Sequence, residues 1–145
     1  MAFTLDFSAQ FAKEFANFQK DQQDAVLDFT ATYIAHGLAD FTKYTGKITP
    51  TWNGVLVGSQ QYNFAKSNDL WHYHIGLPHY SYVHPKYATS DWVLHFQWPS
   101  KGSHIRIVDM CYHTMSTGAF YVPGPQYLVP APAADPSDPK EAATE

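Results

Sequence analysis

Hydrophobic and polar side chains alternate along four stretches of this chain, a pattern typical of half-buried β-strands. The stretches cover residues 2–7, 70–75, 91–98 and 104–111. Because successive side chains of an extended strand point to opposite sides of a sheet, each stretch has an apolar edge and a polar edge. Residues 99–102 contain proline, serine and glycine, which predicts a hairpin turn between the last two stretches.

Between the first and second stretches, apolar residues recur at spacings of three and four, which predicts two helices. The first helix follows Ser8, a residue suited to the N-cap position, and carries three phenylalanines on one stripe. The second begins after Asp21 and ends at Gly37. The link between them is short enough for an antiparallel helical hairpin.

The order of strand, two helices and three consecutive strands predicts an α+β fold with a helical hairpin on one face of a single sheet. A crossover follows the first strand, so we expect it to pair in parallel with a later strand, while the last three strands form an antiparallel meander. Residues 38–68 give only a weak signal and are expected to be loop. Residues 1–128 are predicted to form one domain, and the Pro- and Ala-rich acidic residues 129–145 a disordered tail.

Composition agrees with one folded domain, because 45% of the 145 residues are hydrophobic and 17% are aromatic. The formal net charge is −4, and residues 129–145 carry most of it, with four acidic residues against one lysine. The rest of the chain is therefore nearly neutral. Contact with nucleic acid would depend on locally placed cations or protonated histidines, since a broad basic field is missing.

The location of the protein follows from what the sequence lacks. The single cysteine, Cys111, excludes an internal disulfide. No apolar stretch approaches the length needed to cross a membrane. The first residues lack the basic start and continuous apolar segment of a signal peptide. We expect a cytoplasmic protein with no membrane partner.

The polar edges of the last three stretches carry three histidines and the sole arginine of the chain, namely His72, His74, His95 and Arg106. Side by side in one sheet, these residues would gather on one open face. A histidine, with an ordinary pKa of about 6.5, can accept or supply a proton at neutral pH, and an arginine can hold a phosphate through two hydrogen bonds. Such a face suits acid–base chemistry on a phosphate ester. For each residue an ordinary strand or core role is an equal alternative.

Metal binding is the competing use of these histidines, because two same-face imidazoles on one strand are a known ligand geometry. Four histidines lie between positions 72 and 84. The same segment has no carboxylate or cysteine at a recognisable ligand spacing. We therefore expect no metal and no cofactor.

Several segments of the chain resemble a known family. Phe-Thr-Leu-Asp-Phe-Ser-Ala-Gln-Phe-Ala-Lys-Glu-Phe (3–15) and Asp-Gln-Gln-Asp-Ala-Val-Leu (21–27) look like the first strand and helical hairpin of RelE/ParE-superfamily toxins. Leu-Trp-His-Tyr-His-Ile-Gly-Leu-Pro (70–78), Asp-Trp-Val-Leu-His-Phe-Gln-Trp (91–98) and His-Ile-Arg-Ile-Val-Asp-Met (104–110) look like the three strands that complete that fold. The sequences of these strands are most similar to the YafO-like branch, and the resemblance covers about residues 3–128.

The resemblance implies a toxin of a type II toxin–antitoxin system, neutralised by a cognate antitoxin protein. Most such toxins act with the ribosome as mRNA endonucleases, using the 2′-hydroxyl as nucleophile, and so inhibit translation and growth. His113 lies where the family often keeps a functional residue, which adds it to the catalytic candidates above. His79, Tyr80 and Lys86, in the long link before the second of the last three strands, are candidates for RNA contact.

The chain differs from RelE-type enzymes in one respect, and two other functions also fit the same fold. RelE-type enzymes usually place several Lys and Arg residues on the open face, whereas this chain has one arginine and few strand lysines, so histidine would replace them. A non-catalytic protein-binding module on the same fold fits the low basic content. A ParE-like gyrase inhibitor also fits, because that branch needs no catalytic face.

Overall fold

The computed structural model describes residues 2–82, 88–114 and 121–130. Its strands are β1 (Thr4–Phe7), β2 (Ile48–Pro50), β3 (Leu70–His74), β4 (Trp92–Gln97) and β5 (His104–Tyr112). Its α-helices are α1 (Ala9–Ala16), α2 (Lys20–His36) and α3 (Gln60–Ser67). Short 3-10 helices lie between them, at η1 (Phe41–Lys43), η2 (Thr51–Gly54), η3 (Pro99–Lys101) and η4 (Pro125–Leu128).

The strands form one mixed sheet in the order β1-β5-β4-β3-β2. β1 pairs in parallel with β5, and the remaining neighbours pair antiparallel. The predicted α+β class is confirmed. The predicted sheet is wrong in its strand order, because β2 extends it beyond β3 to five strands. This strand and α3 both arise from residues 38–68, which were expected to be loop.

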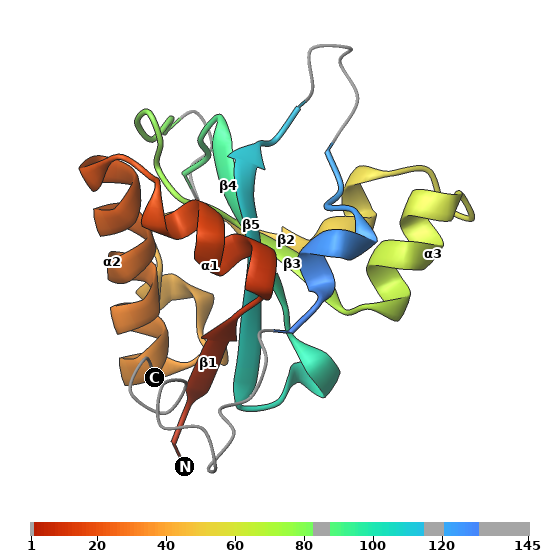
Figure 1. Cartoon of the computed structure of the whole chain (residues 1–145), viewed down its shortest axis with the longest axis horizontal. Helices are drawn as coiled ribbons and strands as arrows, with labels where there is room; N and C mark the ends of the chain where they lie inside the picture. The colour runs from red at the N-terminus through yellow and green to blue at the C-terminus, as the bar shows by residue number, and fades with distance from the viewer. Residues whose placement is uncertain (1, 83–87, 115–120, 131–145) are drawn as a thin grey trace.

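Helices α1 and α2 cover one face of the sheet (Figure 1). The side chain of Ser8 accepts a hydrogen bond from the amide of Phe11 and caps α1, as predicted. α2 begins at Lys20 with Gln19 as its N-cap, two positions before the predicted Asp21 cap. Gly37 ends it with a φ of 65°, a conformation that other residues rarely adopt.

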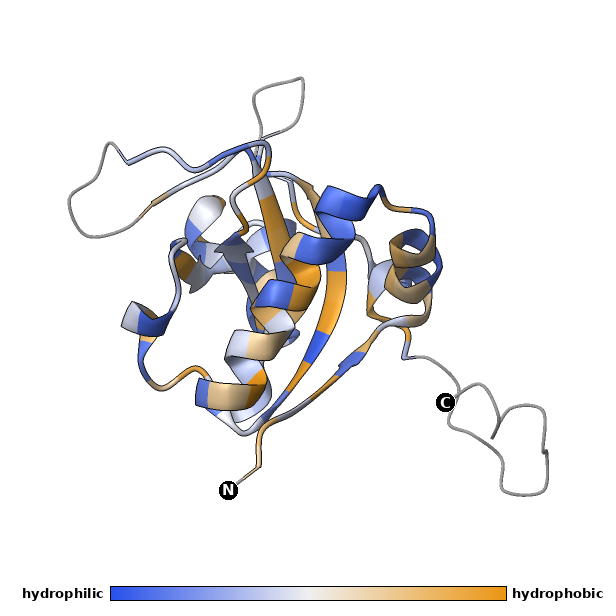
Figure 2. Cartoon of the chain, turned by 90° about the vertical axis from the view of Figure 1, so that its left-hand side faces the viewer, coloured by the Kyte–Doolittle hydropathy of each residue, from blue (hydrophilic) through white to orange (hydrophobic). Residues whose placement is uncertain are grey.

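The main hydrophobic core lies between this helical hairpin and the sheet. It is rich in aromatic rings, such as Phe29, whose centroid lies 5.0 Å from that of Tyr73 and 5.7 Å from that of Phe96. In Figure 2 the strands beneath the helices include runs of hydrophobic residues, and the helices also carry hydrophilic ones. The alternation in β3, β4 and β5 thus directs their apolar edges toward α1 and α2.

The opposite face is only partly covered, by α3 and the short helices η2 and η4 (Figure 1). Ala65, Leu70 and Val108 form a second, smaller buried cluster there. The prediction of one fully open face is therefore wrong for this end of the sheet. Beyond Leu70, β3 continues to His72 and His74, which lie past this cluster.

The end of the described chain returns to the start of α1. The Ala9 amide donates a hydrogen bond to the Val129 carbonyl, and Ser8 forms an isolated bridge with Pro130. Two residues of the predicted tail therefore pair with the domain, while residues 131–145 lie outside the described residues. Within the described ranges, none of the helices has the length and apolar character that crossing a membrane requires.

Candidate functional site

Four imidazoles lie close together on the α3 side of the sheet. His72 of β3 is the cross-strand partner of His95 of β4, and their ring centroids are 5.5 Å apart. His74 lies two positions further along β3, 5.7 Å from His72, because alternate residues of a strand share a face. The ring of His113, just after β5, lies 5.5 Å from His72 and 5.3 Å from His74. We call these four residues the imidazole cluster. The strand pattern predicted that His72, His74 and His95 share a face, and His113 was added by the family resemblance.

Two members of the cluster border a hollow that is open to solvent. His72 and His95 are 2% and 0% exposed and are sealed by their neighbours. His74 and the half-buried His113 line an open hollow of about 490 Å³. The rest of its lining consists of polar and aromatic side chains, from His79, Ser81, Thr89, Ser90, Asp91, Tyr112 and Thr114. Among the predicted catalytic histidines, His74 and His113 are therefore the two that a substrate in this hollow could touch.

Hydrogen bonds fix the two β3 rings. The Nδ1 atom of His72 lies 3.1 Å from the hydroxyl of Thr51, which is fully buried in η2. The Nδ1 atom of His74 lies 3.0 Å from both the carbonyl oxygen and the amide nitrogen of Ser90. Ser90 is itself held, because its hydroxyl accepts a hydrogen bond from the Gly76 amide. A buried side-chain hydroxyl therefore orients the ring of His72, and backbone atoms orient the ring of His74.

His113 is positioned by the chain on either side of the hollow. Its amide donates a hydrogen bond to the carbonyl of Asp91, and its carbonyl accepts one from the amide of Tyr121. Its Nδ1 atom lies 3.1 Å from the hydroxyl of Thr114. The ring stacks on that of His74 with an interplanar angle of 28°. Two imidazoles, one from β3 and one from the residue after β5, thus lie side by side at the wall of the hollow.

Burial lowers the pKa of every ring in the cluster. Desolvation is the main cause, and it lowers the pKa of His74 to about 4 and that of His95 to about 3. The pKa of His72 is well below its ordinary value, first through burial and then through repulsion by the other rings. Burial also lowers the pKa of His113. At neutral pH the cluster is therefore uncharged and its nitrogens can accept protons.

Lys47 supplies positive charge to the cluster. Its carbonyl accepts a hydrogen bond from the amide of His74, and its amide donates one to the carbonyl of Ala88. Its charge is a further cause of the lowered pKa values of His72, His74 and His113. The sequence reasoning missed this residue, because it lies just before β2, in a segment without a strand or helix pattern.

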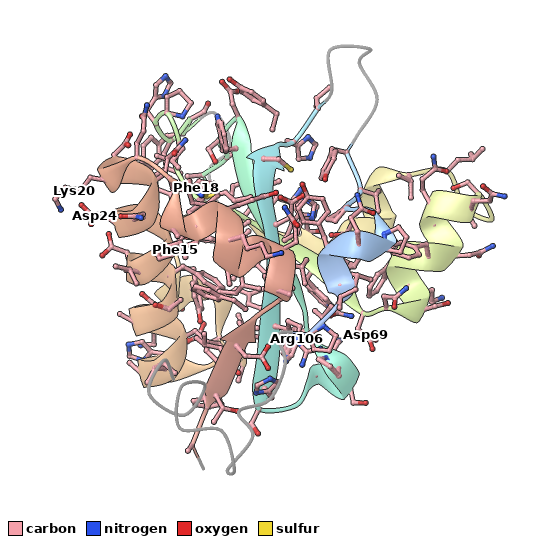
Figure 3. The ribbon with its side chains drawn as sticks, in the orientation of Figure 1. Phe15, Phe18, Lys20, Asp24, Asp69 and Arg106 are labelled. Carbon is pink, nitrogen blue, oxygen red and sulfur yellow. The ribbon has the colours of Figure 1, made fainter. Side chains whose placement is uncertain are left out.

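Arg106 does not join the cluster, so the prediction that it stands beside the imidazoles is wrong. It lies near the beginning of β5 (Figure 3). His113 follows the other end of that strand. Parallel pairing with β1 places Asp6 opposite Arg106. The Asp6 carboxylate accepts two hydrogen bonds from the guanidinium, at 2.8 and 3.2 Å. The arginine therefore links two strands and does not face the hollow.

The three predicted RNA contacts have different outcomes. His79 is exposed and lines the hollow, as an RNA contact would require. Tyr80 turns to the α2 side, where its hydroxyl lies 2.8 Å from that of Tyr73 and burial raises its pKa. It does not line the hollow, and its contact with RNA stays a prediction. Lys86 lies outside the described residues.

A buried carboxylate behind the cluster was also missed. Asp109 is 3% exposed and lies opposite His95 in the β4–β5 pairing. Burial raises its pKa to about 6, although hydrogen bonds from the Tyr121 hydroxyl and the Met110 amide act in the opposite direction. The Tyr121 ring also lies 5.8 Å from that of His95. In the sequence, Asp109 is an isolated acid in an apolar strand, which by itself indicates no partner.

No family model, curated protein or solved structure matches this chain. The site offers two neutral imidazoles at the wall of a hollow, an ammonium group nearby, and a polar rim that includes Asp91 and Tyr112. These groups can move protons and attract an anion.

Proposed function

We propose that this protein is an endoribonuclease that cleaves mRNA on the ribosome, and that it acts as the growth-inhibiting toxin of a toxin–antitoxin pair. One observation carries the proposal: His74 and His113 are stacked, with ring centroids 5.3 Å apart, at the wall of an open hollow. Two adjacent imidazoles can divide the proton transfers of RNA cleavage between them. The resemblance of the strand segments to RelE-type toxins points to the same reaction.

The reaction needs two proton transfers and charge stabilisation. One imidazole removes the proton of the 2′-hydroxyl, whose oxygen attacks the phosphorus and forms a 2′,3′-cyclic phosphate. The other imidazole, protonated, gives its proton to the departing 5′-oxygen, so a 5′-hydroxyl end is released. A phosphate anion in the hollow raises the pKa of the ring beside it, which allows one histidine to carry that proton. The ammonium of Lys47 stabilises the negative charge of the pentavalent phosphorus.

The sealed histidines take a supporting place in this scheme. His72 and His95 are too deeply buried to touch RNA, so we assign them to positioning the two outer rings. The hollow is within the size range of pockets for small ligands and can hold one nucleotide. The rings of His79 and Tyr112 at its rim suit stacking on an unpaired base.

The weak charge of the chain favours a ribosome-bound substrate. Tight binding to free RNA depends on many phosphate contacts with Lys and Arg, and this chain has nine such residues against 13 acidic ones. The ribosome would supply the binding that the protein lacks by presenting the mRNA. A cognate antitoxin protein that covers the hollow would block this activity.

The test is expression from a tightly repressed promoter, combined with mapping of mRNA ends in a translating extract. The wild-type chain should arrest growth and produce fragments with new 5′-hydroxyl ends. His74→Ala and His113→Ala should each reduce cleavage by roughly 10²-fold or more, the usual contribution of a general acid or base. His36→Ala changes an exposed histidine at the end of α2 and should leave cleavage unchanged. Unaltered growth together with intact mRNA would exclude the proposal.

Lys47 offers a second, graded test. Lys47→Met removes the charge but keeps most of the side-chain length, and should lower the single-turnover cleavage rate by roughly 10-fold to 10²-fold. Lys13→Met, on the exposed surface of α1, is the matched control. Equal rates for the two variants would show that the ammonium of Lys47 has no part in the reaction.

A further inference from the structure

Three members of the imidazole cluster meet the geometric conditions for a metal site. One ring nitrogen from each of His72, His74 and His113 lies within 4.8 Å of the corresponding atoms of the other two. We propose that these three imidazoles bind a divalent transition-metal ion of the zinc class, with the fourth coordination position open to the hollow. This inference goes beyond the proposed nuclease and stands on the geometry of the three rings alone.

The ligand type selects the class of metal. Imidazole nitrogen suits zinc, copper, nickel and cobalt, whereas calcium and magnesium prefer oxygen ligands. A tetrahedral zinc site with bonds of about 2.0–2.1 Å places its nitrogens about 3.3 Å apart. The three rings would therefore have to close by up to about 1.5 Å. His113 can provide this movement, because it lies beyond the end of β5 and is only half buried.

Each ring is already held through its Nδ1 atom. The partners are the Thr51 hydroxyl for His72, the Ser90 backbone for His74 and the Thr114 hydroxyl for His113. A metal-binding histidine usually has its second nitrogen hydrogen-bonded in this way, which fixes the direction of the ring. In all three residues the Nε2 atom lies on the far edge of the ring from its partner, so we assign Nε2 as the ligand atom.

The surroundings favour an open site over a closed one. Structural zinc sites have four protein ligands, whereas sites with three protein ligands keep one position for water or substrate. His95 lies behind His72 and is not one of the three converging residues. The hollow lies against His74 and His113, where the fourth ligand would be. The charge of Lys47 opposes a bound cation, and the carboxyl residue Asp91 at the rim of the hollow offsets that charge in part.

A bound ion would also control the proposed reaction. It would occupy nitrogens of both His74 and His113, the two rings assigned to proton transfer above. The consequence, which does rest on the proposed function, is that zinc inhibits RNA cleavage and a chelator restores it. Metal binding itself has a separate readout, so the two proposals can fail independently.

The test is titration of the full chain with ZnCl₂ by calorimetry, and with CoCl₂ by visible absorption, after treatment with a chelator. We expect one ion per chain, a tetrahedral cobalt spectrum and a rise of several degrees in Tm with zinc. His113→Ala should weaken binding at least 10-fold; this half-buried residue can be replaced without opening the core. His79→Ala is the matched control, because His79 lines the same hollow but is not one of the three ligands.

The outcomes separate the possibilities. Loss of binding in His113→Ala with retention in His79→Ala supports the site. Equal binding by both variants, or no binding by the wild-type chain, overturns it. A chain that cleaves RNA but binds no zinc refutes only the metal site, and one that binds zinc but leaves mRNA intact refutes only the nuclease. If His113→Ala has a lowered Tm without metal, His113→Gln provides the same comparison with a larger side chain.

Discussion

The two faces of the sheet are built from the same five strands but have different chemistry. The face under α1 and α2 is a continuous core of aromatic and aliphatic side chains. The other face carries a small apolar cluster near the start of β3 and the imidazole cluster further along. In β3, adjacent residues lie on opposite faces of the sheet. Tyr73 packs among aromatic rings on one face, while His72 and His74 lie on the other.

The difference follows from how much of each face is covered. α2 is 17 residues long and, together with α1, covers its face of the sheet, where buried aromatic and aliphatic side chains form one cluster. α3 has only eight residues and packs mainly against η2 and β3. The far end of that face is left to polar side chains. A stable core on one side thus allows the other side to keep buried imidazoles, which cost free energy unless they are hydrogen-bonded.

The largest effect is expected on the core face. Phe96 is completely buried and packs against Phe29 of α2. Phe96→Ala should lower the free energy of unfolding by about 3–5 kcal/mol, because it removes a large buried ring and leaves a cavity. Leu56→Ala, at a side chain that is 80% exposed, should change it by less than about 0.5 kcal/mol. Urea denaturation of the two variants measures both values. A small loss for Phe96→Ala would mean that the helical hairpin does not pack as described.

The next largest effect is expected at Asp109, behind the imidazole cluster, where the contribution to stability depends on pH. Burial raises the pKa of Asp109 in the folded protein to about 6, against an ordinary value of 3.8. Folding favours the protonated form of Asp109. Its contribution to the stability of the folded protein is therefore fully present below pH 3.8 and is lost as the pH rises through about 6. Asp109→Asn removes the titration. The stability of the variant relative to wild type should therefore increase between about pH 4 and pH 6, by about 3 kcal/mol at most.

Chemical denaturation at several pH values between 4 and 8 tests this expectation. Asp28→Asn, at an exposed position of α2, is the control for the Asp-to-Asn exchange itself. A difference between Asp109→Asn and wild type that does not change with pH would show that Asp109 is ionised without cost in the folded protein. In that case the α3 face would be less sealed than the exposure of Asp109 indicates.

The local pattern of the sequence predicted the core face and part of the site. Alternation in residues 70–75 and 91–98 identified two neighbouring strands, and parity then placed His72, His74 and His95 on one face. Such inference works because the side-chain direction in a strand is fixed by the backbone. It needs no knowledge of distant residues.

What the sequence did not predict depends on distant partners. Arg106 was expected at the phosphate, but the parallel register with β1 places Asp6 opposite it, 100 positions earlier in the chain. Lys47 enters the site beside β2, a strand of three residues that is too short to show a periodic pattern. The burial of Asp109 likewise depends on Tyr121, which approaches from beyond the strand. Each of these placements is set by pairing between segments that are far apart in sequence.

The smallest effect is expected for a hydrogen bond between threonine and histidine, which occurs once in a buried and once in an exposed environment. The Thr51 hydroxyl lies 3.1 Å from Nδ1 of His72, and the Thr4 hydroxyl lies 2.8 Å from Nδ1 of His104. The first pair is buried and the second is exposed. Thr51→Val should cost about 1–3 kcal/mol of unfolding free energy, because it leaves a buried ring nitrogen without this partner. Thr4→Val should change the same quantity by less than about 0.5 kcal/mol, because water replaces the lost hydroxyl.

Valine has nearly the shape of threonine, so the comparison isolates the hydrogen bond from packing. Both variants can be measured in one series of urea titrations at pH 7.5, where the imidazole of His72 is neutral in the folded chain. The buried variant should also disturb the orientation of His72, which would appear as a shift of its ring resonances in NMR spectra. If both variants lose equal stability, the hydrogen bond to His72 is no stronger than a surface contact. The imidazole cluster would then be held by the packing of neighbouring side chains alone, as the main hydrophobic core is.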